Sequence, residues 1–392
     1  MNLLFVTHYG ELYGANKSLL DQCEGLIRAG INVFVLAPLG NDFEQLAMQK
    51  GIELIGFNNF SKYTVTTILK PTIKTKIKEI LKKVLCRISV GRNSKKIAKI
   101  IKKNDIDIVH TNCSVILEGA VAAKKAKVPH VLHIRECLEP AYNSKYSCPR
   151  FAKKMLYDSS KSIITISNTV KNYISPMVDN KSKIKVIYDA VELETDKDLL
   201  TSLNEKKVFV STGVISRQKG FHDAIDAFAK MSIDAQEQAE LWIVGGYDEN
   251  DSYYQELLQK TDQYKLTEKV KFLGFRNDIG NIIKNAYCGL TCSYMEGLGR
   301  TTIEYMLSGK PVIGSNSGAT VEILHNNETG LIYEYGNTDE LAIKMEYLIK
   351  NSCIAQKFGQ AGREYAEYEF SKERYTNLLL KVYEELLEKK DK

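Results

Sequence analysis

Short apolar runs alternate with amphipathic helical segments along the whole chain. Each run is rich in branched apolar residues and ends in glycine or polar residues. An alternation of this kind predicts α/β domains built on parallel sheets. The predicted strands of the first half are Leu3–Thr7, Asn32–Ala37, Glu53–Phe57, Ile106–Thr111, His130–Ile134, Ser162–Asn168 and Lys185–Val191. Those of the second half are Val208–Thr212, Leu241–Gly245, Val270–Phe275, Leu290–Tyr294 and Val312–Ser315.

The length of the chain predicts two domains. A single hydrophobic core rarely serves 392 residues, and the strand pattern resumes after a polar segment at Glu192–Lys207. We therefore expect a linker there, between a first domain at 1–192 and a second Rossmann-like domain at 193–370. An amphipathic pattern at Lys372–Glu388 predicts a last helix within the remaining residues, 371–392.

Composition narrows the class of protein. Apolar residues make up 44% and charged residues 26% of the chain, which is typical of a globular protein. No apolar run reaches the ~18 residues of a membrane span, and the strand-like start at Met1–Thr7 is unlike a signal peptide. We therefore expect a cytoplasmic protein. The eight cysteines lack metal-ligand spacing, so we expect reduced thiols and no metal site.

Lys and Arg gather in residues 62–103, where Glu79 is the one acidic residue. Between residues 72 and 88, apolar side chains recur at helical spacing with lysines between them, which predicts a basic amphipathic helix. Two interpretations stay open: the helix rests on an anionic membrane surface, or its apolar face packs on the sheet of the first domain. Nucleic acid is not favoured, because no aromatic side chains interleave with the basic ones.

A glycine loop separates the strand at Leu290–Tyr294 from a short helix predicted at Thr301–Leu307. Gly297 and Gly299 let the backbone approach a ligand, and the helix start offers unpaired N–H groups to a phosphate or diphosphate. Glu304, about one turn inside the helix, is suited to accept hydrogen bonds from neutral hydroxyls such as a ribose diol. Glycine loops of this kind also occur at strand ends that bind no ligand.

A second loop follows the strand at Val208–Thr212 and carries Arg217, Lys219 and Gly220. Arginine offers a bidentate fork and lysine a point charge, so the two cations suit a diphosphate. The alternative is that both side chains are simply solvated.

The order of these motifs resembles glycosyltransferase family 4, which are retaining enzymes of the GT-B fold. The segments that carry the resemblance are Glu296–Gly299, Glu304–Met306, Gly309–Ile313, Ser317–Glu322 and Thr329–Leu331. The resemblance implies an α/β protein with two Rossmann-like domains whose parallel sheets face each other across a cleft. It also implies a C-terminal helix that returns to the first domain. The sequence departs from the family at Val214, where an arginine is usual, and at Tyr188–Ala190, where Pro-Asn-Gly is usual.

The resemblance implies a nucleotide-diphosphate sugar as co-substrate in the second domain, an acceptor in the first, retention of configuration, and neither cofactor nor metal. Glu296 would then orient the sugar, Lys219 would take up leaving charge, and His133 would touch the sugar as the third catalytic residue. The expected donor-binding residues are Glu304, Gly297, Leu298, Gly299, Arg300, Arg217, Phe275 and Arg276. The expected acceptor-binding residues are Gly14, Asn16 and Lys17 in the loop after the first strand.

The basic helix favours an acceptor at the inner face of a bacterial plasma membrane, such as a polyprenyl-linked glycan for capsule or lipopolysaccharide. Two other functions share the expected fold. A sugar-nucleotide epimerase would need no acceptor, and a non-catalytic membrane scaffold would suit the departures at Val214 and Tyr188–Ala190. A Rossmann oxidoreductase is not favoured, because neither half contains Gly-x-Gly-x-x-Gly.

Overall fold

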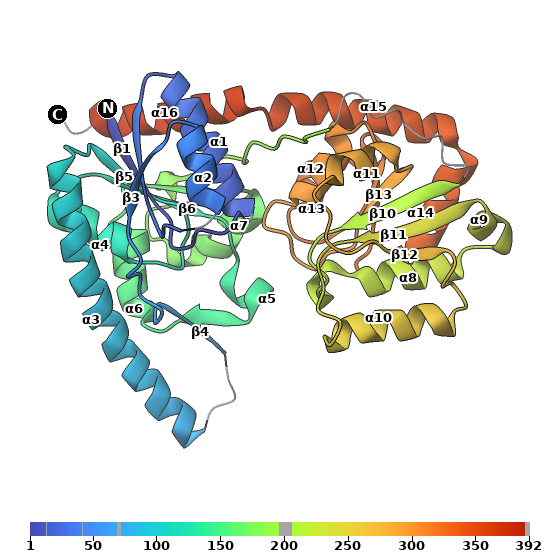
Figure 1. Cartoon of the computed structure of the whole chain (residues 1–392), viewed down its shortest axis with the longest axis horizontal. Coiled ribbons are helices and arrows are strands. Elements are labelled where there is room, and N and C mark those ends of the chain that lie inside the picture. The colour runs from blue at the N-terminus through green and yellow to red at the C-terminus, as the bar shows by residue number, and fades with distance from the viewer. Residues whose placement is uncertain (13, 41, 69–71, 196–205, 389–392) are drawn as a thin grey trace. The chain divides into compact units, whose positions relative to one another are not determined.

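The computed structural model describes residues 1–12, 14–40, 42–68, 72–195 and 206–388 (Figure 1). Most of the predicted linker at Glu192–Lys207 lies outside these residues. The contacts divide the chain into two compact units. The N-terminal unit is Met1–Ala190 together with the helix that begins at Lys372, and the C-terminal unit is Val191–Ser371.

A seven-stranded sheet forms the centre of the N-terminal unit, in the order β3-β2-β1-β5-β6-β8-β9. All of its strand pairs are parallel, whereas the separate β4-β7 ribbon is antiparallel. The strands are β1 (Asn2–Val6), β2 (Asn32–Ala37), β3 (Glu53–Gly56), β4 (Val65–Thr67), β5 (Ile108–Thr111), β6 (His130–Ile134), β7 (Ser144–Tyr146), β8 (Ser162–Thr165) and β9 (Ile184–Val186).

Each face of this sheet has its own core, because alternate residues of a strand face opposite sides. Leu3 and Phe5 of β1 pack with α1, α2 and α16, whereas Leu4 and Val6 pack with α3 and α4. The α-helices of the unit are α1 (Gly14–Arg28), α2 (Asp42–Gln49), α3 (Ile73–Lys103), α4 (Glu118–Ala126), α5 (Leu138–Tyr142), α6 (Pro149–Ala152), α7 (Asn168–Ile174) and α16 (Lys372–Glu388). The sheet is thus covered by helices on both faces.

The C-terminal unit contains a six-stranded parallel sheet in the order β12-β11-β10-β13-β14-β15. Its strands are β10 (Lys207–Thr212), β11 (Ala239–Val244), β12 (Val270–Phe272), β13 (Cys288–Thr291), β14 (Val312–Ser315) and β15 (Gly330–Tyr333). Its α-helices are α8 (Phe221–Lys230), α9 (Ile233–Glu237), α10 (Ser252–Gln263), α11 (Ile279–Asn285), α12 (Arg300–Leu307), α13 (Thr320–Ile323), α14 (Thr338–Lys350) and α15 (Ser352–Glu369). The expected α/β class, with one parallel sheet in each half of the chain, is confirmed.

Several predicted bounds can be compared with the structure. The strand at Val312–Ser315 and the helix at Lys372–Glu388 form with the predicted bounds. The strand predicted at Val270–Phe275 is shorter in the structure, where β12 ends at Phe272. Gly274, at φ +65°, turns the chain just beyond it. The basic helix predicted at 72–88 is the first part of α3, which is 31 residues long.

The described residues include no helix that is both long and apolar enough to cross a membrane. Seven of the eight cysteines are buried, and Cys353 is exposed. No three His, Cys, Asp or Glu side chains within the described ranges gather in a way that could hold a metal ion.

Candidate functional site

The central strands of the C-terminal sheet define where a ligand can bind. β10 has β11 on one side and β13 on the other, so the strand order reverses between β10 and β13. In open α/β sheets, ligands bind at the carboxyl ends of the strands at such a point. The loop after β10 carries Lys219, and the loop after β13 carries Glu296.

Lys219 and Glu296 meet at this point. The Lys219 Nζ lies 2.6 Å from Glu296 Oε1, and the two side chains are 29% and 15% exposed. The two loops are also joined by their backbones, because Tyr294 N donates to Gln218 O at 2.8 Å. The structure therefore brings together two of the three expected catalytic residues.

Gly220 allows the two loops to approach. It follows the short 3₁₀ turn Arg217–Lys219 at φ +68°. A Cβ atom at this position would lie 2.0 Å from the carbonyl oxygen of Cys292, at the end of β13. No other residue fits there without displacement of the strand end, so Gly220 fixes how Lys219 is presented.

The glycine loop leads into α12 through Gly299, which adopts φ +83° directly before Arg300. Leu298 is 4% exposed, so its side chain packs inside the unit and only its backbone remains for a ligand. Arg300 and Glu304 are half-buried on the first turns of α12, and both already interact with other residues. The first turn of α12 follows Glu296–Gly299 directly in the chain, and the start of a helix is an arrangement that favours an anion.

Gly318 supports the backbone of Glu296. A Cβ at Gly318 would lie 2.4 Å from Glu296 N and 2.7 Å from Glu296 O, and Ala319 N donates to Glu296 O at 3.0 Å. Ser317–Glu322 is one of the segments that resemble glycosyltransferase family 4, and the structure shows what this segment contacts. Its turn holds the backbone of the candidate catalytic glutamate.

We predict that the Gly318→Ala substitution lowers the stability of the protein and displaces Glu296 from its position in the candidate site. Its φ of +59° costs about 1–2 kcal/mol for a residue with a side chain, and the added methyl group must also push Glu296 away. Gly336→Ala is the matched control, since Gly336 has φ +79° but a methyl group added there would meet no atom within 4 Å. Melting curves should place Gly318→Ala well below Gly336→Ala. Equal melting temperatures would contradict a role for Gly318 beyond its backbone angle.

Of the other expected donor-binding side chains, two are paired with carboxylates and one is largely exposed. Arg217 pairs with Glu256 and lies 4.8 Å above the ring of Tyr253, so it does not join Lys219 in this structure. Arg276 is paired with Asp278 at 2.7 Å. Phe275 is 74% exposed. The idea that Arg217 replaces the arginine missing at Val214 therefore needs Arg217 to leave Glu256.

The residues of the N-terminal unit that were expected to bind the acceptor differ in their exposure. Asn16 is fully buried, and its side chain accepts from Thr7 Oγ1 at 3.0 Å and donates to the carbonyl oxygens of Tyr9 and Glu11 at 2.9 Å. These hydrogen bonds hold the loop together, so a direct contact between Asn16 and an acceptor is not supported. Gly14 and Lys17 are exposed and remain candidates.

His133 requires a correction. It lies on β6 with 0% exposure, and its Nδ1 is 3.2 Å from His110 Nε2. Burial lowers the pKa of both imidazoles well below the usual value, so both are neutral. A strand-end histidine was expected to reach a sugar, but His133 is enclosed by its own unit, and we assign it to the support of the fold.

A buried ion pair next to His133 was missed by the sequence analysis. Arg135 and Asp189 pair at 9% and 3% exposure. Arg135 also donates to Asn112 Oδ1 and Ser18 Oγ, and Tyr375 of α16 donates to Asp189 Oδ1 at 3.2 Å. The sequence does contain an indication of this pair, since Arg135 and Asp189 each stand in a largely apolar stretch. A charged residue that is buried requires a partner.

Known structures identify the class of this fold. Anabaena HepE, solved with UDP and glucose, matches with a TM-score of 0.79 at 21% identity, over 98% of this chain and 100% of that one. The lipopolysaccharide outer core galactosyltransferase WaaB matches with a TM-score of 0.73 at 16% identity, over 98% and 100%. The two parallel-sheet units therefore have the GT-B fold of glycosyltransferases.

Sequence comparison gives the family. A model described as Glycosyltransferase Family 4 matches residues 13–195, and one described as Glycosyl transferases group 1 matches residues 194–365. Together they span nearly the whole chain, which belongs to glycosyltransferase family 4. A similar curated protein is the capsular polysaccharide biosynthesis glycosyltransferase CapM of Staphylococcus aureus, 24% identical over 65% of this chain and 69% of that protein. Another is the N-acetyl-alpha-D-glucosaminyl L-malate synthase of Bacillus anthracis, 22% identical over 74% and 78%.

Proposed function

We propose that the protein transfers a sugar from a nucleotide-diphosphate sugar to a glycan or polyprenyl-linked acceptor, with retention of configuration and without a metal. The observation that carries this proposal is the 2.6 Å contact between Lys219 and Glu296 at the ends of the two central strands. It lies beside a glycine loop and a helix start, where a diphosphate is favoured. The similar HepE protein was solved with UDP and glucose and with UDP-glucose, which supports a donor of this class.

The Lys219–Glu296 pair gives each partner a role in the proposed reaction. When a donor binds, the Lys219 ammonium turns from the carboxylate to the diphosphate, where it stabilises the charge of the departing group. Glu296 is then free to accept hydrogen bonds from sugar hydroxyls. Both side chains are partly exposed, so exchange of partners costs little.

The chemical step is proposed as attack on the face from which the diphosphate leaves. The bond between the anomeric carbon and the phosphate oxygen breaks, and the bond to the acceptor oxygen forms on the same face. The acceptor proton passes to the departing phosphate oxygen. Lys219 and the N–H groups of α12 hold that oxygen's charge, so the step needs no protein nucleophile.

The acceptor is proposed to bind the N-terminal unit near Gly14 and Lys17, at the inner face of the plasma membrane. Both residues are exposed in the first turn of α1, the helix that follows β1. The similarity to a capsular polysaccharide enzyme supports an acceptor that belongs to a surface polymer.

Thermal stabilisation tests the donor site. Melting temperatures of the purified protein would be measured with UDP-sugars and GDP-sugars, since a ligand of the native state raises the melting temperature by mass action. We expect one nucleotide class to raise it, and Lys219→Ala and Glu304→Ala to reduce the increase. Lys269→Ala, which removes an ion pair of equal 2.6 Å length in the same unit, should leave the increase unchanged. Absence of any increase would contradict the proposal and favour a non-catalytic role.

A further inference from the structure

Helix α3 has two parts with different surroundings. Its second part packs on the N-terminal sheet, where Val90, Ile97 and Ile101 are almost fully buried. Its first part, residues 76–88, extends beyond the sheet to which the second part is attached (Figure 1). Packing on the sheet therefore does not explain the apolar residues in this first part of α3.

The projecting part carries an exposed apolar stripe. Each member has another member three or four residues away, so they share one side of the helix. Their exposures range from 50% to 62%. The stripe consists of Ile77, Ile80, Leu81, Val84 and Ile88. The interpretation that this apolar face packs on the sheet of the first domain is therefore wrong.

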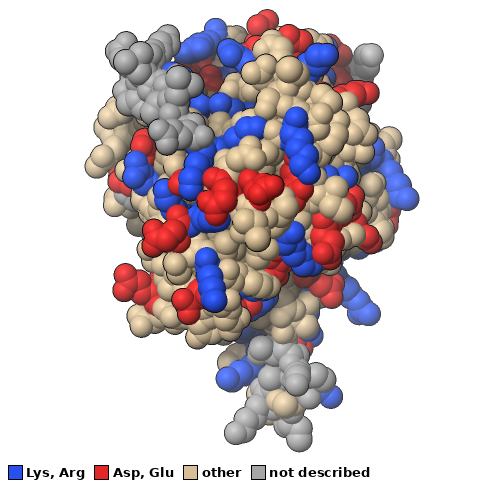
Figure 2. Space-filling view, turned by 90° about the vertical axis from the view of Figure 1, so that its right-hand side faces the viewer, with Lys and Arg blue, Asp and Glu red and all other residues tan. Residues whose placement is uncertain are grey.

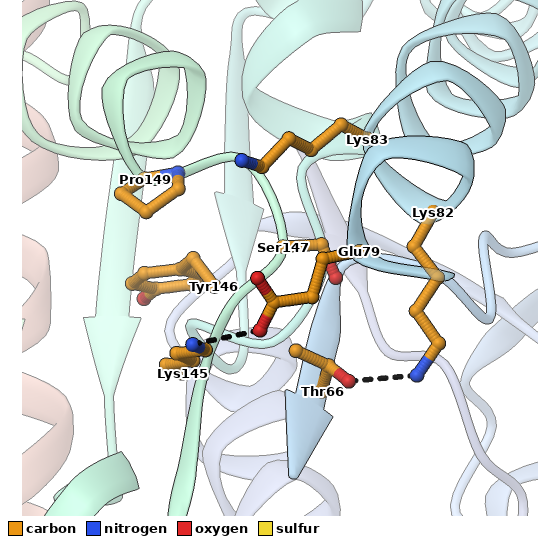
Figure 3. A pocket seen from close by; sticks show the side chains of 8 residues that line it. All are labelled: Thr66, Glu79, Lys82, Lys83, Lys145, Tyr146, Ser147 and Pro149. Atoms are coloured by element: carbon orange, nitrogen blue, oxygen red, sulfur yellow. Dashed lines mark hydrogen bonds and ion pairs between the residues drawn. The ribbon is translucent and has the colours of Figure 1, made fainter. Parts of the chain in front are cut away.

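The opposite side of the projecting part is held by the β4-β7 ribbon, as Figure 3 shows. Glu79 pairs with Lys145 at 2.9 Å, and Lys82 Nζ donates to Thr66 Oγ1 at 2.7 Å. These contacts surround a small cavity of about 80 Å³. Because residues on opposite sides of a helix cannot face the same neighbour, the ribbon directs the stripe outward.

Positive charge is concentrated on the same segment. Residues 62–103 contain fourteen Lys and Arg and only Glu79 as an acid, so their net charge exceeds the +6 of the entire chain. The rest of the chain is net negative. In the view of Figure 2, positive and negative side chains are interspersed over the large face toward the viewer. Lys76, Lys78 and Arg87, beside the stripe, are exposed.

We propose that residues 76–88 of α3 form a preformed docking surface for an anionic lipid bilayer, with the apolar stripe in the headgroup boundary and Lys76, Lys78 and Arg87 on the headgroups. An outward apolar stripe with basic flanks is what such a surface binds. Lys82 and Glu79 have a different role, because they face the ribbon and fix the helix. The proposal rests on the proposed function in that a lipid-linked acceptor would be reached from this surface.

Vesicle flotation tests the docking surface. The full chain would be mixed at low salt with vesicles of phosphatidylcholine alone or with added phosphatidylglycerol. We expect flotation only with the anionic vesicles, and a loss of about fivefold in affinity for each of Lys76→Gln and Lys78→Gln. The triple variant Ile80→Ser/Leu81→Ser/Val84→Ser should lose at least about tenfold.

The matched control is Ile233→Ser/Ile343→Ser, which removes two side chains that are 76% and 68% exposed in the C-terminal unit. Flotation equal to that of the unchanged chain is expected for this control. No flotation of the unchanged chain, or equal loss in the control and the triple variant, would overturn the proposal. So would light scattering that shows a dimer which the triple variant converts to a monomer, since the stripe would then bind a second copy.

The donor-induced increase in melting temperature separates this inference from the proposed function. The triple variant should keep that increase, because its substitutions lie in the other unit from Lys219. Flotation without a donor response would contradict only the proposed function. A donor response without flotation would contradict only the membrane docking surface.

Discussion

Lys219→Met is expected to lower the turnover number for sugar transfer by about a hundredfold or more. The substitution keeps most of the side-chain volume but removes the positive charge that lies 2.6 Å from the Glu296 carboxylate. Loss of a single group that stabilises transition-state charge typically costs about 10²–10³ in turnover. Release of the nucleoside diphosphate would be measured with the donor found by thermal stabilisation.

Lys269→Met is the control for this prediction. Lys269 forms an ion pair of the same length with Glu237, and both residues lie in the C-terminal unit. If the two variants have the same turnover number, the Lys219–Glu296 contact is only another surface ion pair. Glu296→Gln adds a second readout, because it should impair sugar transfer while leaving Lys219 available to the diphosphate.

Arg135→Met is expected to destabilise the N-terminal unit by about 3–5 kcal/mol. The substitution leaves the Asp189 carboxylate buried without its cation, and removal of one partner of a buried pair costs about this much. The N-terminal unit contains no tryptophan, whereas Trp242 lies on β11 of the C-terminal unit. The urea unfolding transition followed by far-UV circular dichroism should therefore shift to a lower urea concentration. The transition followed by Trp242 fluorescence should stay in place.

Lys153→Met provides the comparison. Lys153 and Asp179 pair at 2.7 Å, but their side chains are 43% and 77% exposed, so the loss of this pair should leave the unfolding midpoint almost unchanged. Equal unfolding midpoints for Arg135→Met and Lys153→Met would mean that Asp189 finds other partners. A shift of the Trp242 transition would mean that the two units unfold together.

The sequence predicted best what is determined by near neighbours in the chain. The strand at Val312–Ser315 follows Gly309 and Pro311, which end the helix before it, so its start is determined locally. The last helix follows from its own apolar spacing. The loops that carry Lys219 and Glu296 were also located by local signals, because each residue stands beside a glycine after a strand.

The sequence predicted poorly what depends on a distant partner. Arg217 was expected at the phosphates, but Glu256 in α10 pairs with it. His133 was expected to face a ligand, but it contacts His110 of β5, which in turn contacts Tyr383 of α16, and no local pattern predicts these neighbours. The exposure of the apolar stripe of α3 was also not predictable from local patterns. It depends on how far the sheet extends along the helix.

The N-terminal unit is built from both ends of the chain, and this has a consequence during protein synthesis. Tyr375, Leu379, Val382 and Tyr383 of α16 complete the core that begins with Leu3 and Phe5. A ribosome must make all of the C-terminal unit before it makes these residues. The first unit to be synthesised is therefore the last whose core can close, and until then its α1 face presents apolar surface to chaperones. Translation thus reverses the usual N-terminal-first order of domain folding.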